Sequence, residues 1–203
     1  MTTEIDAIER IILKKDPKIP MVVIREHLLR YILALESVTD KDVLDLGFGS
    51  GFGMHLMSYF AKSVSGYDYS EEALNEAKKF QYHCDCCLEI RNLEEDKSLA
   101  NSKHDKFGVV TFFETIEHLS NPHIVLKNIK ECLALNGIVY ISTPNDLTHT
   151  DKNKWHKVHF DFYSLFNLIK ETFNDPKVEF WGQDQWGLTK DYTKPYIVAK
   201  INL

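Results

Sequence analysis

Side chains that could move a proton cluster in one short segment, Glu114-Thr115-Ile116-Glu117-His118-Leu119. The segment directly follows FGVVTFF (107–113), a β-branched and aromatic run typical of a buried strand. Histidine titrates close to neutral pH, so His118 could act as a general base that Glu117 orients. The alternative is structural: Glu117 and His118 hold the loop by hydrogen bonds to its backbone.

A glycine-rich loop is the second feature that could bind or position a reactant. Residues 43–53, VLDLGFGSGFG, combine a short apolar strand with Gly47, Gly49 and Gly51. Glycines let the backbone approach a ligand, and the amides that open the next helix favour a negative group. The spacing is G-x-G-x-G, whereas dinucleotide-binding loops need G-x-G-x-x-G. Phe52 and Met54 occupy the third glycine position in the two possible registers.

Two aspartates accompany this loop. Asp45, near the end of the first strand, is costly to bury unpaired and needs a cationic or N–H partner, either a ligand ammonium or the loop's own amides. Asp68 ends the second predicted strand, 21 residues after Gly47. A carboxylate there can accept hydrogen bonds from both hydroxyls of a ribose. The pattern favours a nucleoside ligand over a glycine turn and a strand-end aspartate that bind nothing.

The elements that must position these residues alternate between strands and helices. Short apolar runs predict seven strands, and helical periodicity separates most of them, which favours an α/β fold with a doubly wound, mainly parallel sheet. We expect a helix from Ser70 to about Tyr82, and another from Ile124 to a cap at Asn136-Gly137. The strands are expected at 43–46, 63–67, 86–91, 107–113, 138–142, 177–181 and 196–201, with a last helix at 163–173.

The N-terminal forty residues contain two helical segments separated by Pro17 and Pro20. The second, about 21–37, is apolar nearly all round, so we expect it to pack on the sheet. We therefore expect a helical cap over residues 1–40 and a ligand-binding domain over 41–203, together one compact unit.

Composition excludes several classes of protein. The net charge of −6 gives no overall attraction to nucleic acid or anionic membranes. The apolar stretches are too short to cross a bilayer, and the acidic N-terminus does not resemble a secretory signal, so we expect a cytoplasmic protein. Four cysteines fit reduced thiols there. The cluster Cys84-Asp85-Cys86-Cys87 lacks a second cluster with zinc spacing, which favours packing in a strand over metal binding.

Four stretches together closely resemble the class I S-adenosylmethionine (SAM)-dependent methyltransferases. They are VLDLGFGSGFG, VSGYDYSEEALNEA, FGVVTFFETIEHL and NGIVYISTPN, and the resemblance covers about residues 25–183. The last two are similar to small-molecule O-methyltransferases of the ubiquinone pathway and of polysaccharide gene clusters. Two positions depart from the family pattern: Gly108 stands where aspartate is usual, and Phe48 where cysteine is common.

The resemblance implies a binding role for each motif. Asp45 and the Gly47–Gly51 loop would hold the methionine end of SAM, and Asp68 the ribose, with Tyr69 beside the adenosine. The strand ends supply further contacts: Asn92 and Leu93 to the adenine, Phe113 and Glu114 to the methionine moiety. Arg30 would reach the SAM carboxylate, unless it is a surface arginine.

The resemblance also implies an acceptor side. A set of four residues resembles the metal-binding set of small-RNA 2′-O-methyltransferases: Glu114, Glu117 and His118, joined by His159. Many relatives have the same residues without binding a metal. A divalent ion there would lower the pKa of a hydroxyl. Trp155, His156 and His159, with Phe160 and Tyr163, would form a pocket wall or lid, or else pack on the last helix.

These observations favour a methyltransferase that modifies an oxygen atom of a small molecule. The alternatives are an RNA 2′-O-methyltransferase that uses a divalent metal and a catalytically silent SAM-binding subunit. The acidic charge makes nucleic acid an unfavourable partner. An NAD-dependent oxidoreductase is disfavoured by the loop spacing, and no N-P-P-Y-type loop of DNA adenine methyltransferases follows the fourth strand. Neither the acceptor nor the oligomeric state follows from these residues.

Overall fold

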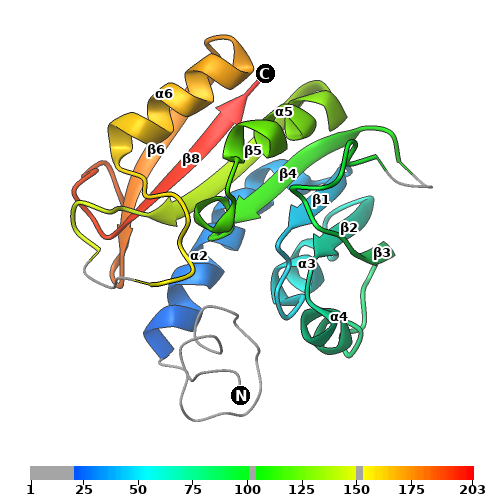
Figure 1. The fold of residues 1–203 in the computed structure, drawn as a ribbon. Coiled ribbons are helices and arrows are strands. Elements are labelled where there is room, and N and C mark those ends of the chain that lie inside the picture. Colours follow the sequence, from blue (N-terminus) through cyan, green and yellow to red (C-terminus); the bar gives the residue numbers. More distant parts are fainter. Residues whose placement is uncertain (1–20, 101–103, 150–152) are drawn as a thin grey trace.

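A computed structural model describes residues 21–100, 104–149 and 153–203 of the chain. Helices and strands alternate along most of it, as the periodicity predicts (Figure 1). The helical elements are α2 (Met21–Val38), α3 (Phe52–Met57), α4 (Glu71–Ala77), the 3-10 turn η1 (Ile116–His118), α5 (Pro122–Cys132) and α6 (Phe162–Phe173). The strands are β1 (Asp42–Leu46), β2 (Ser63–Asp68), β3 (Asp85–Ile90), β4 (Phe107–Phe113), β5 (Leu133–Pro144), β6 (Lys177–Asp184), β7 (Gly187–Thr189) and β8 (Tyr196–Asn202).

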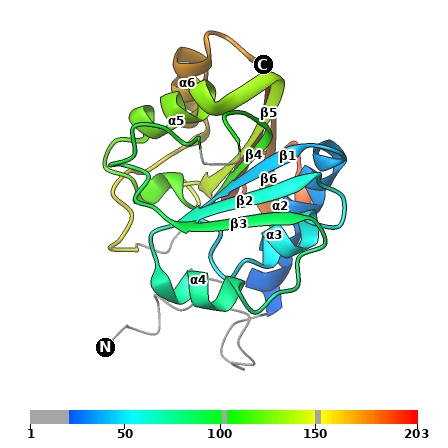
Figure 2. The ribbon, with the colours of Figure 1, turned by 90° about the vertical axis from the view of Figure 1, so that its right-hand side faces the viewer.

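The strands described form one sheet in the order β3-β2-β1-β4-β5-β8-β6-β7. Strands β1 to β5 pair in parallel, while β8, β6 and β7 add antiparallel pairs at one side. Figure 2 looks toward the β3 edge, with α4 beside it. Because β1 lies between β2 and β4, the chain leaves the carboxyl end of β1 at the point where a doubly wound sheet opens a crevice.

Helices cover both faces of this sheet (Figure 1). Helices α5 and α6 pack on one face around residues such as Leu126 and Ile169, which are fully buried. Helices α2, α3 and α4 cover the other face, where Ala34, Met54 and Ala77 are fully buried. The predicted doubly wound α/β fold is therefore confirmed.

Three predicted details were wrong. The described part of the chain has eight strands instead of seven, because β6 turns back at Gly187 into the three-residue β7. Helix α5 ends at Cys132, and Asn136-Gly137 lies inside β5, where Asn136 has φ 58° and the pairing with β4 shifts register. The asparagine–glycine pair thus marks a strand irregularity and not a helix cap. Helix α4 ends at Ala77, five residues before Tyr82.

None of the described helices is both long and apolar enough to cross a membrane.

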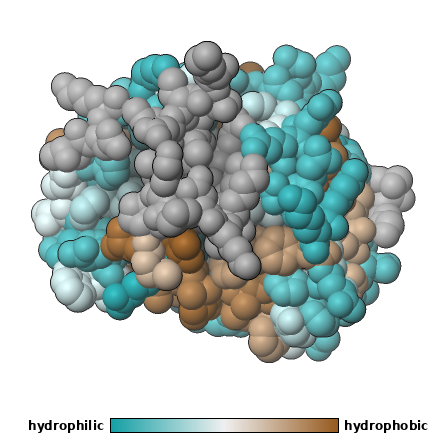
Figure 3. Space-filling model, turned by 90° about the horizontal axis from the view of Figure 1, so that it is seen from below, coloured by the Kyte–Doolittle hydropathy of each residue, from teal (hydrophilic) through white to brown (hydrophobic). Residues whose placement is uncertain are grey.

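Figure 3, which views the molecule from below, shows apolar residues gathered between hydrophilic ones on that face. Helix α2 has exposed apolar side chains at Met21 and Ile32. The first of the two predicted N-terminal helical segments lies outside the described residues.

A buried polar contact fastens α2 to the sheet. The hydroxyl of Tyr31 donates to Asp45 on β1 across 3.0 Å, and the hydroxyl of Thr111 on β4 donates to the other carboxylate oxygen across 2.7 Å. Asp45 is 1% exposed. Loss of solvent raises its pKa from 3.8 to about 7, and Asp68 adds to the rise, although the two hydroxyl donors oppose it. The carboxylate therefore serves the docking of α2.

Asp45→Asn should flatten the pH dependence of stability. Because the folded-state pKa of Asp45 is raised, the folded chain binds more protons than the unfolded chain between about pH 4 and pH 7, so this group lowers the free energy of unfolding as pH rises through that window. Between about pH 5 and pH 8 the loss amounts to about 2 to 3 kcal/mol. Urea denaturation of wild type and Asp45→Asn at both pH values measures it.

The exposed Asp85, at the start of β3, provides a matched control as Asp85→Asn. This control should retain the pH dependence of the wild type. Identical pH dependence in wild type and Asp45→Asn would contradict the raised pKa.

Candidate cofactor and acceptor cavity

The glycine loop after β1 has the backbone conformation that its sequence predicts. Gly47, Gly49 and Gly51 have φ values of 73°, 55° and 80°, a region that disfavours other residues. A Cβ atom at Gly47 would lie 2.2 Å from the Thr115 hydroxyl oxygen, and one at Gly51 would lie 2.5 Å from the Cβ of Ala77. At Gly49 nothing lies within 4 Å of that position. Gly49 is therefore open, whereas Gly47 and Gly51 allow close packing of the loop.

Asp68 lies at the carboxyl end of β2, directly across from this loop. One carboxylate oxygen accepts from the backbone N–H of Gly49 at 3.0 Å, and the other accepts from that of Ser70 at 2.9 Å. These bonds fix the orientation of the carboxylate while it remains on a cavity wall. An acceptor held in this way suits a pair of vicinal hydroxyls.

A cavity of about 600 Å³ opens beside these two groups. This volume lies within the range of small-molecule and cofactor sites. It extends from the glycine loop and Asp68, past the end of β4, to His118 and Trp155. Ten of the predicted site residues line it: Gly47, Gly49, Asp68, Tyr69, Asn92, Leu93, Phe113, Glu114, His118 and Trp155.

Six predicted residues are not on the lining of this cavity. Asp45 lies behind the wall and holds Tyr31, so it does not face the cavity as the resemblance implies. Gly51 packs against α4. Arg30 is fully buried and not a surface residue, with its guanidinium behind Glu114. The other three, Glu117, His156 and His159, line a neighbouring cavity of about 10 Å³.

Glu114 has an unusual backbone conformation at the tip of β4. Its φ of 47° is uncommon for a residue with a side chain, and such residues concentrate at functional sites. Its carboxylate accepts from the Ser142 hydroxyl at 2.7 Å and lies 3.4 Å from a terminal nitrogen of Arg30. The strand-end carboxylate is therefore held on the cavity wall from two sides.

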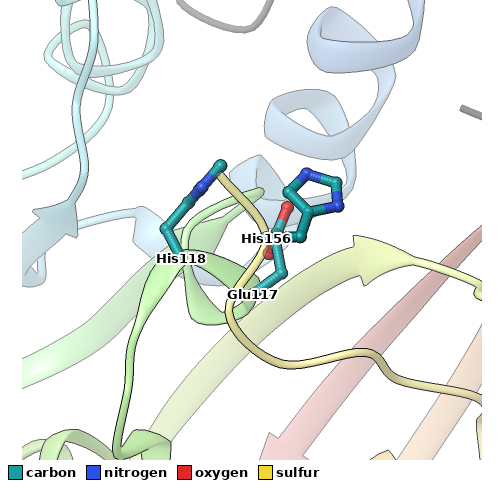
Figure 4. A group of neighbouring side chains, drawn as sticks. All are labelled: Glu117, His118 and His156. Atoms are coloured by element: carbon teal, nitrogen blue, oxygen red, sulfur yellow. The ribbon is translucent and has the colours of Figure 1, made fainter. Parts of the chain in front are cut away.

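Glu117, His118 and His156 form a cluster beside the His118 end of the cavity (Figure 4). Their possible ligand atoms all lie within 4.8 Å of one another, the spacing of a metal-binding group. Glu117 is 2% exposed, and one of its carboxylate oxygens makes no hydrogen bond within the described residues. Burial, reinforced by the nearby Glu114, raises the pKa of Glu117 well above its ordinary value. A metal cation bound to this oxygen, or a proton on it, would compensate for the missing hydrogen bond.

His156, not the expected His159, completes this group. His159 lies 2.9 Å from Asp146 instead. Part of the structural alternative also holds, because a ring nitrogen of His118 lies 3.3 Å from the carbonyl oxygen of Trp155. Among the described residues, the cysteines at 84–87 contribute to no such metal-binding group.

Several cavity residues carry no signal in the sequence motifs. His27 and Tyr31 come from α2, and their four-residue spacing is the available clue, since it sets both on one helix face. Lys157 lies 3.2 Å from Glu94, and both line the outer part of the cavity. Phe48 and Ser50 belong to the predicted Gly47–Gly51 loop. The other lining residues that were not named individually are Phe52, Gly53, Tyr67, Arg91, Thr115 and Leu119, and all but Arg91 lie inside the quoted motifs.

Comparisons with known proteins agree with this geometry. A family model described as a methyltransferase domain matches residues 22–174. A ubiquinone biosynthesis O-methyltransferase of Glaesserella parasuis is 32% identical over 108 residues, which cover 52% of this chain and 46% of that protein. Its counterpart in Pasteurella multocida is 28% identical over 116 residues, 53% of this chain and 48% of that one. The matches therefore span about half the length of these curated relatives.

Solved structures share the fold. The small RNA methyltransferase HEN1 has a TM-score of 0.72 at 18% identity, over 87% of this chain and 25% of that chain. The N-methyltransferase NodS of Bradyrhizobium japonicum, in complex with S-adenosyl-L-homocysteine (SAH), has a TM-score of 0.67 at 15% identity, over 97% and 96% of the two chains. The family model, which matches most of the chain, shows that the chain belongs to the methyltransferase domain family, within the class I SAM-dependent methyltransferases.

Proposed function

We propose that this chain transfers a methyl group from SAM to an oxygen atom of a small molecule. The observation that carries the proposal is the continuity of the cavity, which joins Asp68 and the glycine loop to His118 and Trp155. A volume of about 600 Å³ accommodates a nucleoside cofactor at one end and a small acceptor at the other. Methyl transfer requires such a shared space, because the two reactants must meet in line.

The residues at the first end fit SAM. Asp68 would accept hydrogen bonds from the ribose, and Asn92 and Leu93 would border the adenine. The anionic Glu114 faces the region between the two ends, where it would favour the cationic part of the cofactor. When bound, SAM supplies an activated methyl group on a sulfonium. The chain's own task is then to orient an acceptor and to exclude water.

The second end would handle the acceptor. His118 lines the cavity and would take the proton of an acceptor hydroxyl, provided that its imidazole is neutral. Buried Glu117, beside it, would orient the imidazole. Trp155 offers an apolar surface at the same end, half exposed in the structure. The ubiquinone biosynthesis enzymes named above support oxygen as the methyl acceptor.

Titration with SAH tests the cofactor half of the proposal. We expect saturable binding by wild type, and stabilisation against heat by SAM or SAH but not by NAD. Asp68→Asn should weaken SAH binding at least about tenfold, because a hydrogen bond to a charged group contributes about 1.5–3 kcal/mol. The exposed Asp85→Asn should bind as wild type does. Wild-type affinity in Asp68→Asn would remove Asp68 from the ribose role, and no SAH uptake at millimolar concentration would refute the proposal.

A second candidate is an RNA 2′-O-methyltransferase that uses a divalent metal. The observation in its favour is the Glu117, His118 and His156 group, which offers one carboxylate and two imidazoles to an ion. Such an ion would lower the pKa of a ribose hydroxyl and stabilise the oxyanion. The net charge of −6 weighs against an RNA substrate.

Methylation assays with and without Mn²⁺ separate the two candidates. The RNA candidate requires methylation of RNA that depends on Mn²⁺ or Mg²⁺ and is lost in Glu117→Ala. Our main proposal predicts no RNA methylation in either condition, and turnover of a small hydroxylated acceptor. Tight SAH binding without turnover of any acceptor, together with stable co-purification of another protein, would instead support a silent subunit.

A further inference from the structure

Arg30 on α2 is a fully buried cation with few partners. Its Nε donates to the side-chain oxygen of Gln183 across 2.6 Å, and its guanidinium lies over the ring of Tyr196 at 4.6 Å. One terminal nitrogen is 3.4 Å from a carboxylate oxygen of Glu114. Neither terminal nitrogen makes a hydrogen bond within the described residues. The direction of this side chain therefore depends on its Nε contact.

Gln183 on β6 supplies that contact although it lies 153 residues further along the chain. It is fully buried, and its amide nitrogen donates to the backbone carbonyl of Glu26 at 2.8 Å. Both ends of one amide group thus bind α2, one on the backbone and one on the guanidinium. Gln183 therefore fixes both the position of α2 along β6 and the direction of the Arg30 side chain.

Glu114 is the cavity-lining carboxylate that Arg30 contacts. Arg30 does not line the cavity, whereas Glu114 does. Burial raises the pKa of Glu26 and of Glu117, and the charge of Arg30 opposes this rise in both. Arg30 is thus the buried cation that lies next to the Glu114 carboxylate, on the side away from the cavity. A carboxylate held there suits a cationic ligand group on the cavity side.

We propose that Gln183 is a positioning residue of the cofactor site, which orients Arg30 so that Arg30 holds the Glu114 carboxylate toward the cavity. Arg30 acts through Glu114 and does not touch the cofactor's carboxylate. Glu114 in turn faces the ammonium of the cofactor's amino-acid end. This inference rests on the proposed function, since it concerns the same cofactor.

A double-mutant cycle on SAH affinity tests the proposal. Gln183→Met removes both hydrogen bonds with a side chain of similar length, and Arg30→Met removes the charge. Each should weaken SAH binding about five- to twentyfold in the wild-type background, but less than about twofold once Glu114→Gln is present, because coupled residues are non-additive. Binding of 5′-methylthioadenosine, which lacks the amino-acid end, should change less than about twofold in every variant.

Matched controls lie on the same elements. Gln185→Met, two residues further along the β6–β7 hairpin, and Arg25→Met, on α2, replace exposed residues and should bind SAH as wild type does. Gln183→Glu retains an oxygen acceptor for Arg30, so it should keep most of the SAH affinity. This variant also keeps the test decisive if Gln183→Met does not fold.

Three results would overturn the inference. Equal losses for Arg30→Met with and without Glu114→Gln would mean that Arg30 acts directly on the cofactor. Parallel losses for SAH and methylthioadenosine would mean that Gln183 only supports the fold. Wild-type SAH affinity in Gln183→Met would remove its positioning role. Absence of SAH binding by the wild type is a different result, because it would refute the proposed function itself.

Discussion

The parallel pairing of β1 with both β2 and β4 is the constraint on which the site depends. Parallel neighbours place the carboxyl ends of all three strands at one edge of the sheet, and the loops that leave them must diverge to reach helices on different faces. The glycine loop follows β1, Asp68 is the last residue of β2, and Glu114 directly follows β4. Their convergence on one cavity is thus a consequence of topology, and the side chains decide which ligand the cavity suits.

Behind the cavity wall, buried polar groups of α2 form hydrogen bonds with buried polar groups of the sheet. Asp45 holds the Tyr31 hydroxyl, and Gln183 holds Arg30, so two sides of α2 are fixed to strands far apart in the sequence. Burying such groups costs free energy unless each has a partner. Both oxygens of Asp45 and both ends of the Gln183 amide have one, whereas the terminal nitrogens of Arg30 make no hydrogen bond within the described residues. Helix α2 becomes a wall of the cavity through these bonds, with Tyr31 exposed to it on one side.

The sequence was sufficient for the doubly wound fold and for seven of the eight described strands, because periodicity and glycine spacing are local signals. It was insufficient where a contact joins distant segments. Asp45 was expected to have a cationic or N–H partner, but its partners are the hydroxyls of Tyr31 and Thr111, on segments that no local pattern connects to it. His156 and His159 differ by three positions in a loop without periodicity, so the choice between them could not be made from spacing. Asn136-Gly137 is compatible with a helix end and with a strand bulge, and strand pairing decided between them.

A crystal structure of the protein with SAH tests the central claim most directly. The account predicts density for the nucleoside in the cavity after β1, with its ribose hydroxyls on the carboxylate of Asp68, its adenine near Leu93 and its sulfur directed toward His118. A nucleoside bound elsewhere, or a ribose that leaves Asp68 without contact, would contradict it.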